Sequence, residues 1–210
     1  MPQSSFTLYG VAISGPTYKV ALMLTLCGEP FAYRHVDLFK GAHKQPEFLA
    51  INRYGQVPAL VHGELRLCQS GAILQYLSEV LGKFAGADTL TRQRTREWLF
   101  WEADRLSPGI NRTRAIARGF LEADPATAKV YREAGEAGLK VLDESLAASN
   151  FIAGAMPTIG DIACYGAIVF AEEGGFRLAD WPHVKAWAGR MAALPGFKAP
   201  LDLLPMNDMR

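Results

Sequence analysis

Cysteine, net charge and long apolar runs are all scarce in this sequence, and each shortage excludes a class of protein. The three cysteines, Cys27, Cys68 and Cys164, are far apart and odd in number. They fit neither the ligand spacing of a metal site nor a disulfide framework. The cysteine spacing therefore leads us to expect no bound metal. Free cysteines suit a reducing compartment, so we expect a cytoplasmic protein.

The sequence offers no apolar run close to the ~20 residues of a membrane-spanning helix. Residues 1–6 lack a basic start followed by a long apolar stretch, so we expect no signal peptide and no membrane partner. The 22 basic and 21 acidic residues leave a net charge of +1, which gives no electrostatic case for nucleic acid as a partner. Basic residues recur between Arg92 and Arg118, but acidic residues are interleaved with them, which is typical of a solvated helix face.

What the chain does have is enough apolar material for a sizeable core. Half of its 210 residues are hydrophobic, which suits one large or two modest domains. Residues 1–82 alternate between strand and helix patterns and predict a thioredoxin-like α/β domain in the order βαβ, short helix, ββα. The strands are predicted at 6–9, 31–38, 57–61 and 65–68, and the helices at 18–27, 46–49 and 73–81.

The remainder of the chain shows almost only helical periodicity. Residues 82–88 are rich in small side chains and are interpreted as a linker. Long amphipathic helices are predicted at 91–106, 126–148, 161–172 and 182–194. We therefore expect an all-α C-terminal domain over residues 89–210.

The junction between the first strand and the first helix carries Ser14-Gly15-Pro16-Thr17. A thioredoxin or glutaredoxin has Cys-x-x-Cys at this junction, whereas here Ser14 and Thr17 hold the two cysteine places. A scaffold that handles thiols but supplies none there points to a thiol that arrives with the ligand, namely glutathione. Ser14 is then placed to donate a hydrogen bond to the glutathione sulfur. The alternative is that Ser14 only caps the helix, a position where serine is preferred.

The chain contains several motifs in a fixed order: Leu8-Tyr9 before Ser14-Gly15-Pro16, Lys40 to His43, Asn52 to Leu60, Gln69 to Leu77, Thr158 to Ala163, and Trp181 to Met191. Together they resemble the cytosolic glutathione transferase superfamily over nearly the whole chain. The serine after the first strand is similar to that of its serine-type branches, which include theta-like and bacterial members. Two departures stand out: Gln69 replaces the more common Glu, and no cysteine lies near Gly15, which removes the disulfide exchange of cysteine-type members.

The resemblance implies a transferase that activates the thiol of glutathione for attack on a hydrophobic electrophile, with peroxide reduction as a further activity. Ser14 is its expected catalytic residue. The same fold also serves non-catalytic scaffolds that bind glutathione or proteins, which is the alternative function. A disulfide reductase that acts through its own cysteines is disfavoured, because no cysteine lies near Ser14.

The resemblance also implies a glutathione-binding set. Val57-Pro58 is expected to be a cis bond that turns the Val57 backbone toward the cysteinyl part of glutathione. The helix start at Ser70 is expected to bind the γ-glutamyl carboxylate, although Ser70 is alternatively a plain N-cap. His43 suits the glycyl carboxylate, with an ordinary exposed loop histidine as the alternative. The full set is His43, Gln56, Val57, Pro58, Gln69 and Ser70.

The co-substrate is expected to bind in an apolar cleft that the helical domain helps to form. Trp101 and Arg105 are the candidates for its wall and for a charged contact. Trp98 and Trp101 are three residues apart on one predicted helix, and aromatic residues at this spacing are usually core, so packing is the alternative role for Trp101. The resemblance implies a homodimer as well.

Overall fold

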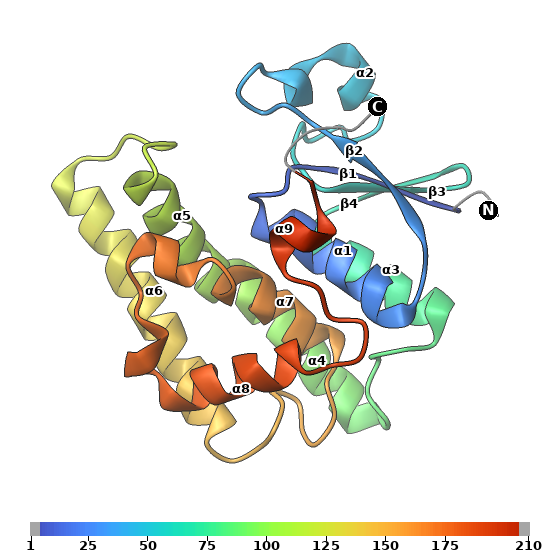
Figure 1. The fold of residues 1–210 in the computed structure, drawn as a ribbon. Coiled ribbons are helices and arrows are strands. Elements are labelled where there is room, and N and C mark those ends of the chain that lie inside the picture. Colours follow the sequence, from blue (N-terminus) through green and yellow to red (C-terminus); the bar gives the residue numbers. More distant parts are fainter. Residues whose placement is uncertain (1–4, 206–210) are drawn as a thin grey trace. The chain divides into compact units, whose positions relative to one another are not determined.

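The computed structural model describes residues 5–205, which form two compact units (Figure 1). One unit contains residues 5–83 together with 194–205, and the other contains residues 84–193. The sequence pattern predicts that the segment after Leu194 belongs to the helical half. In the structure this segment groups with the first unit, where the Lys198 carbonyl accepts a hydrogen bond from the Tyr18 hydroxyl at 2.8 Å. Compactness does not test independent folding, so the boundaries 1–82 and 89–210 stay a prediction.

The first unit has the predicted order of strands and helices. The second strand is shorter than predicted and ends at His35, because the chain then turns: the Lys40 amide donates to the Asp37 carboxylate at 3.0 Å and the Gly41 amide to the Leu38 carbonyl at 3.1 Å. The elements are β1 Phe6–Gly10, α1 Gly15–Cys27, β2 Phe31–His35, a 3₁₀ turn Ala42–Lys44, α2 Pro46–Leu49, β3 Ala59–His62, β4 Leu65–Cys68, α3 Ser70–Leu81 and α9 Pro200–Leu203.

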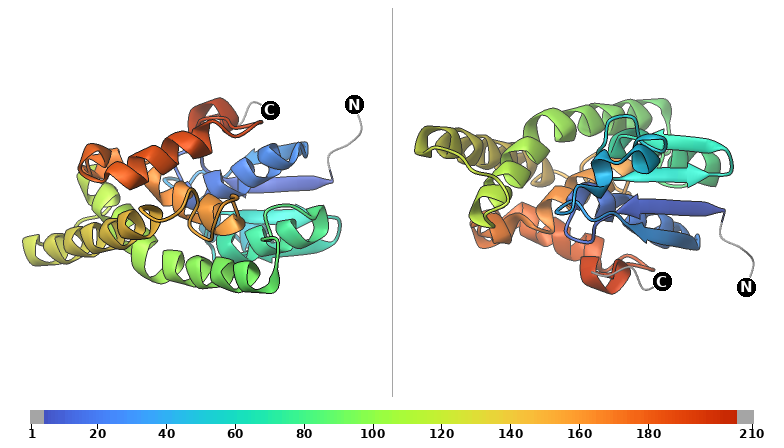
Figure 2. Two further views of the ribbon diagram at one scale, coloured as in Figure 1. Left: turned by 90° about the horizontal axis from the view of Figure 1, so that it is seen from below. Right: turned by 90° about the horizontal axis from the view of Figure 1, so that it is seen from above.

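These strands form a four-stranded sheet in the order β2–β1–β3–β4. β1 and β2 are parallel, whereas β3 is antiparallel to both β1 and β4. Figure 2 shows β1 between β2 and the β3–β4 hairpin. α1 and α3 pack against each other on one side of the sheet, and α2 lies on the other side (Figure 1). The predicted thioredoxin-like α/β fold of this half is confirmed.

A close contact fixes where α1 starts relative to β1. Thr17 is fully buried, and a Cβ atom on Gly10 would lie 2.2 Å from its methyl group. Only glycine at this strand end therefore allows the first turn of α1 to approach β1. This contact holds the intervening loop, including Ser14, directly over the end of the strand.

The second unit is all-helical, as predicted. α7 is its central helix, since every one of its residues is buried. Within residues 5–205, no helix is both long and apolar enough to cross a membrane. The elements are α4 Thr89–Trp101, a π-helical turn Glu102–Leu106, α5 Ser107–Ala117, α6 Pro125–Leu146, α7 Ile159–Ile168, 3₁₀ turns Ala171–Gly174 and Leu178–Asp180, and α8 Pro182–Ala192.

The helix predicted to end at Leu106 instead continues to Ala117, so that predicted end is wrong. The continuation passes through the π-helical turn, in which the Ser107 amide bonds to the Glu102 carbonyl. Pro108 follows immediately and has no N–H to give to the preceding turn. The wider turn accommodates this loss and lets α5 continue from α4.

Glycine allows α5 and α6 to cross closely. A Cβ atom on Gly109 would lie 2.3 Å from the Gly135 nitrogen, and one on Gly135 would lie 2.5 Å from the Phe176 ring.

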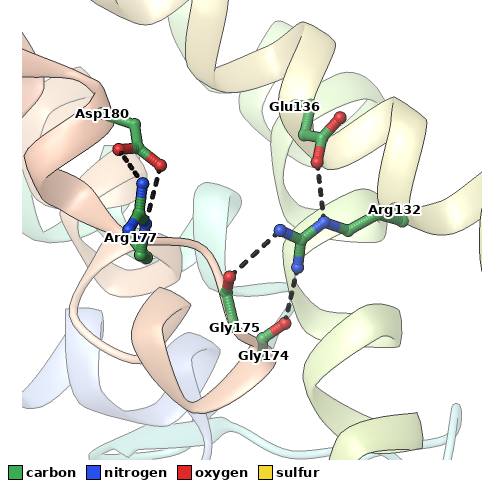
Figure 3. Close-up of polar contacts among 6 residues, drawn as sticks. All are labelled: Arg132, Glu136, Gly174, Gly175, Arg177 and Asp180. Carbon is green, nitrogen blue, oxygen red and sulfur yellow. Dashed lines mark hydrogen bonds and ion pairs between the residues drawn. The ribbon is translucent and has the colours of Figure 1, made fainter.

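On α6, Arg132 stacks over the Phe176 ring at 4.2 Å. Its guanidinium donates to the Gly174 and Gly175 carbonyls at 3.0 Å each, and to Glu136 at 2.8 Å (Figure 3). This arginine thus closes the end of the Ala171–Gly174 turn onto α6.

Asp161, near the start of α7, is fully buried and connects three parts of the helical unit. Its carboxylate accepts hydrogen bonds from the Ile152 amide at 2.9 Å, the Thr158 amide at 2.8 Å, the Thr158 hydroxyl at 3.1 Å and the Trp187 indole at 3.0 Å. Burial raises the pKa of this carboxyl, and the hydrogen bonds oppose the rise. Thr158 and Asp161, the first and fourth residues of the motif Thr158 to Ala163, form a capping box at the start of α7.

We predict that Thr158→Ala lowers the free energy of unfolding by about 1 kcal/mol, the usual value of a lost cap. Asp161→Ala should cost at least about 3 kcal/mol, because it leaves several buried donors unpaired. Urea denaturation of both variants and of the wild type measures this. Equal small losses in the two variants would contradict the central role of Asp161.

Candidate functional site

The register of the sheet brings the predicted site segments to one edge. Tyr9 in β1 pairs with Ala59 in β3, and Ala59 pairs with Cys68 in β4. The three segments that flank these residues are therefore neighbours: the loop that follows β1, Val57-Pro58 before β3, and Gln69-Ser70 after β4. β2 ends at the same edge, where His35 pairs with Gly10.

Ser14 is the half-buried N-cap of α1. Its Oγ accepts a hydrogen bond from the Thr17 amide at 3.2 Å, so the capping role is confirmed. A serine hydroxyl has one donor and two lone pairs, and the cap uses only a lone pair. The hydroxyl hydrogen meets no acceptor among the described residues. It is therefore free to donate to a ligand at the N-terminus of α1, where the helix dipole favours negative charge.

Thr17 has no such freedom. It is fully buried, and its hydroxyl oxygen lies 3.5 Å from the Val11 amide, which points toward it. Tyr9 also belongs to the core, because its ring packs edge-on against Phe48 at 6.4 Å. Ser14 is thus the hydroxyl of this junction that remains for chemistry.

The Val57-Pro58 bond is cis, as predicted. The loop before it is held by Asn52, a residue of the motif Asn52 to Leu60 for which the sequence predicts no role of its own. Asn52 is buried, and its side-chain amide donates to the carbonyls of Gln56 and Pro58, while its oxygen accepts from the Tyr54 amide. Asn52 is therefore a positioning residue, and the signal for it was an amide side chain in the turn just before a proline.

The start of α3 has an unusual backbone. Gln69 precedes the helix with φ 65° and ψ 110°, a region that non-glycine residues rarely occupy and that is often found at functional sites. Ser70 is the first residue of the helix rather than its cap, and no side chain caps this end. The first amides of α3 have no partner inside the helix. They are available to an anion, as the prediction for Ser70 requires.

Side chains join these segments to the loop after β2. The side-chain nitrogen of Gln69 lies 3.4 Å from the side-chain oxygen of Gln56. The Lys44 ammonium donates to the Gly55 carbonyl at 3.1 Å. His43 is in the 3₁₀ turn next to Gly55, and its Nδ1 is buried without a hydrogen-bond partner in the described chain. Nε2 is then the nitrogen through which His43 can meet a ligand.

Cys68 is the cysteine that the register places at this edge. It is half-buried, and its sulfur is 3.9 Å from the Ile51 carbonyl. Burial raises the pKa of the Cys68 thiol, and the charge of Arg53 opposes the rise. Cys27 and Cys164 are buried elsewhere. Since a thiolate is the reactive form, the site does not supply an activated thiol of its own.

The predicted co-substrate residues lie in the helical unit. Trp101 is half-buried at the end of α4, with its ring edge-on to Trp98 at 4.9 Å. Arg105 is exposed and pairs with Asp104 at 2.8 Å. Glu102, between Trp101 and Arg105, is buried and accepts a hydrogen bond from the Ser107 hydroxyl, so its carboxylate does not face solvent. The roles of Trp101 and Arg105 stay predictions.

Comparison with known proteins agrees with the geometry. Residues 4–79 match the N-terminal domain of glutathione S-transferase, and residues 107–195 match its C-terminal domain. The chain belongs to the glutathione S-transferase family. Its similarity to glutathione S-transferase 3 of Zea mays is 34% identity over 95% of this chain and 94% of that protein. Assignment to the serine-type branch of the family stays a prediction.

Two bacterial proteins are also similar to this transferase. One is the disulfide-bond oxidoreductase YfcG of Escherichia coli, which is 31% identical over 92% of this chain and 93% of its own length. The other is a solved glutathione transferase family member from Pseudomonas fluorescens with two glutathione molecules bound. It is 25% identical, with a TM-score of 0.85, and the match covers 95% of this chain and 93% of that one.

We predict that Ser70→Ala raises KM for glutathione about ten-fold and leaves kcat nearly constant. The carboxylate that Ser70 is predicted to bind is remote from the sulfur, so we expect it to be held equally throughout the reaction. Steady-state kinetics at varied glutathione measures this, with the exposed Gln75→Ala on the same helix as control. A large fall in kcat at unchanged KM would contradict the assignment.

Proposed function

We propose that this transferase binds glutathione along the sheet edge described above, lowers the pKa of its thiol, and adds the sulfur to a hydrophobic electrophile. The free hydroxyl hydrogen of Ser14 is the observation that carries the proposal. It lies where negative charge on sulfur would meet both a hydrogen-bond donor and the N-terminus of α1.

Recognition of the tripeptide divides among the neighbouring segments. The cysteinyl backbone pairs with the Val57 backbone next to the cis proline, as a strand added to the sheet edge. The γ-glutamyl carboxylate binds at Ser70 and the open amides of α3, with Gln69 beside it. His43 and Gln56 donate hydrogen bonds to the glycyl carboxylate. The backbone of Gln69 supports this division, since strain of this kind is kept where a ligand needs it.

The chemical step is a nucleophilic attack by the thiolate. The thiol gives its proton to solvent, the sulfur electron pair forms a bond to the electrophilic carbon, and the leaving group departs with the electrons of its own bond. A free thiol has a pKa of about 8.5, so most of it is protonated at neutral pH. Ser14 increases the thiolate fraction and needs no proton transfer of its own.

Reduction of a disulfide is the second candidate, because the similar Escherichia coli protein is a disulfide-bond oxidoreductase. In this chain the attacking sulfur would again be that of glutathione, since burial raises the pKa of Cys68. Turnover with a panel of haloarenes, epoxides, organic peroxides and disulfides separates these reactions. A protein that binds glutathione and turns over none of them would be a scaffold.

We predict that Ser14→Ala lowers kcat/KM by about 100-fold and raises the pKa of bound glutathione, because one donor to the developing charge is lost. Thiolate absorbance of the complex, followed against pH, measures the pKa. Two control variants are measured beside Ser14→Ala. Cys68→Ala should retain the rate of the wild type, and Thr158→Ala removes a comparable helix cap in the other unit. An unchanged titration in Ser14→Ala would reduce Ser14 to a helix cap.

We predict that Trp101→Ala changes the ranking of hydrophobic co-substrates and leaves glutathione binding largely intact. Loss of an aromatic wall affects each apolar co-substrate according to its size and shape. Rates with a series of alkyl-substituted electrophiles measure this, with the adjacent Phe100→Ala, whose side chain is 78% exposed, as control. A uniform loss of rate together with a lower melting temperature would show that Trp101 is core.

A further inference from the structure

The helical unit contains a hollow of about 640 Å³ that none of the glutathione-site residues lines. It lies between α4, along Leu90 to Trp98, and the segment that leads from the end of α6 toward α7. These two parts of the chain are green and yellow to orange in Figure 1. Its volume is within the usual range of small-molecule sites. Its polar lining includes Arg94, Glu97, Ser145 and Ser149.

One face of α4 provides the hollow with a charged and apolar wall. Leu90, Arg94, Glu97 and Trp98 are spaced at i, i+4, i+7 and i+8, which places them on the same side of the helix. Leu90 is 63% exposed although it is apolar. Leu90 and Trp98 therefore offer apolar surface on which an apolar group of a ligand can be removed from water.

The two charged groups in the hollow have no partner. Both side chains are exposed, and neither the Arg94 nor the Glu97 side chain makes a hydrogen bond or ion pair with another residue of the described chain. Elsewhere, charged residues one helical turn apart do pair, as Arg132 and Glu136 do at 2.8 Å. The hollow thus presents a separate cation and anion about one helical turn apart.

The serine hydroxyls add acceptors. Ser145 Oγ donates to the Val141 carbonyl at 2.7 Å, and Ser149 Oγ donates to the Phe151 carbonyl at 2.6 Å. Each hydroxyl has thereby used its hydrogen and retains lone pairs. A ligand ammonium would find acceptors in these oxygens as well as in Glu97.

We propose that this hollow binds a small zwitterion with an apolar side chain, namely an α-amino acid or a short peptide. The ligand carboxylate pairs with the Arg94 guanidinium, and its ammonium lies against Glu97 and the serine oxygens. The apolar side chain packs on Leu90 and Trp98. None of the residues that line the hollow belongs to the sheet edge that contains Ser14, although Trp98 lies edge-on to Trp101 at 4.9 Å.

The test is isothermal titration calorimetry with L-phenylalanine as the probe. We expect binding to the wild type, and a loss of affinity of about ten-fold or more in Arg94→Gln and in Glu97→Gln, because each removes a charge-assisted hydrogen bond. Arg96→Gln is the matched control, since Arg96 is exposed on the same helix and does not line the hollow. N-acetyl-L-phenylalanine and L-phenylalaninamide, which each lack one charge, should bind more weakly than the parent.

Glutathione also carries a zwitterionic end, so the sites are separated by two further titrations. L-phenylalanine should still bind to Ser14→Ala, and saturating S-methylglutathione should not displace it. No heat of binding up to ~10 mM, equal affinity in Arg94→Gln and wild type, or displacement by S-methylglutathione would each overturn the proposal. Equal affinity for N-acetyl-L-phenylalanine would overturn it too, since the hollow would then bind simple anions.

Discussion

The pairing register of β1, β3 and β4 is the constraint on which the proposed glutathione site depends. Tyr9, Ala59 and Cys68 lie in line across the three strands. Three segments that are far apart in sequence therefore meet at one edge of the sheet. A slip of one residue in either pairing would turn every side chain of that strand to the opposite face. Gly10 completes the arrangement by letting α1 begin directly over the edge.

Most of this edge could be predicted because its signals are local. Ser14 before an apolar helix and the strands predicted at 57–61 and 65–68 are each specified by nearby residues, and the family resemblance supplied the cis bond at Pro58. Asn52 was missed because its role rests on hydrogen bonds to carbonyls four and six residues away, which no propensity encodes. The backbone of Gln69 was missed for a similar reason, since a positive φ at a non-glycine residue is imposed by its surroundings.

The helical unit was predicted well in class and less well in its boundaries. Apolar periodicity located each main helix, but it could not show that the chain continues through Pro108 by way of a π-helical turn. Nor could it show that Asp161 would hold three segments together through four hydrogen bonds, because those partners converge only in the folded unit. The charged hollow on α4 is likewise visible only once α6 and its following loop are in place.

The central claim is that the sheet edge binds glutathione with its sulfur at Ser14. A crystal structure of the wild-type protein with glutathione tests it most directly. We predict that the sulfur lies within hydrogen-bonding distance of Ser14 Oγ. The cysteinyl backbone should pair with the Val57 backbone, and the γ-glutamyl carboxylate should bind at the first amides of α3. A glutathione molecule bound along this edge with its sulfur turned away from Ser14, or bound in another part of the protein, would contradict it.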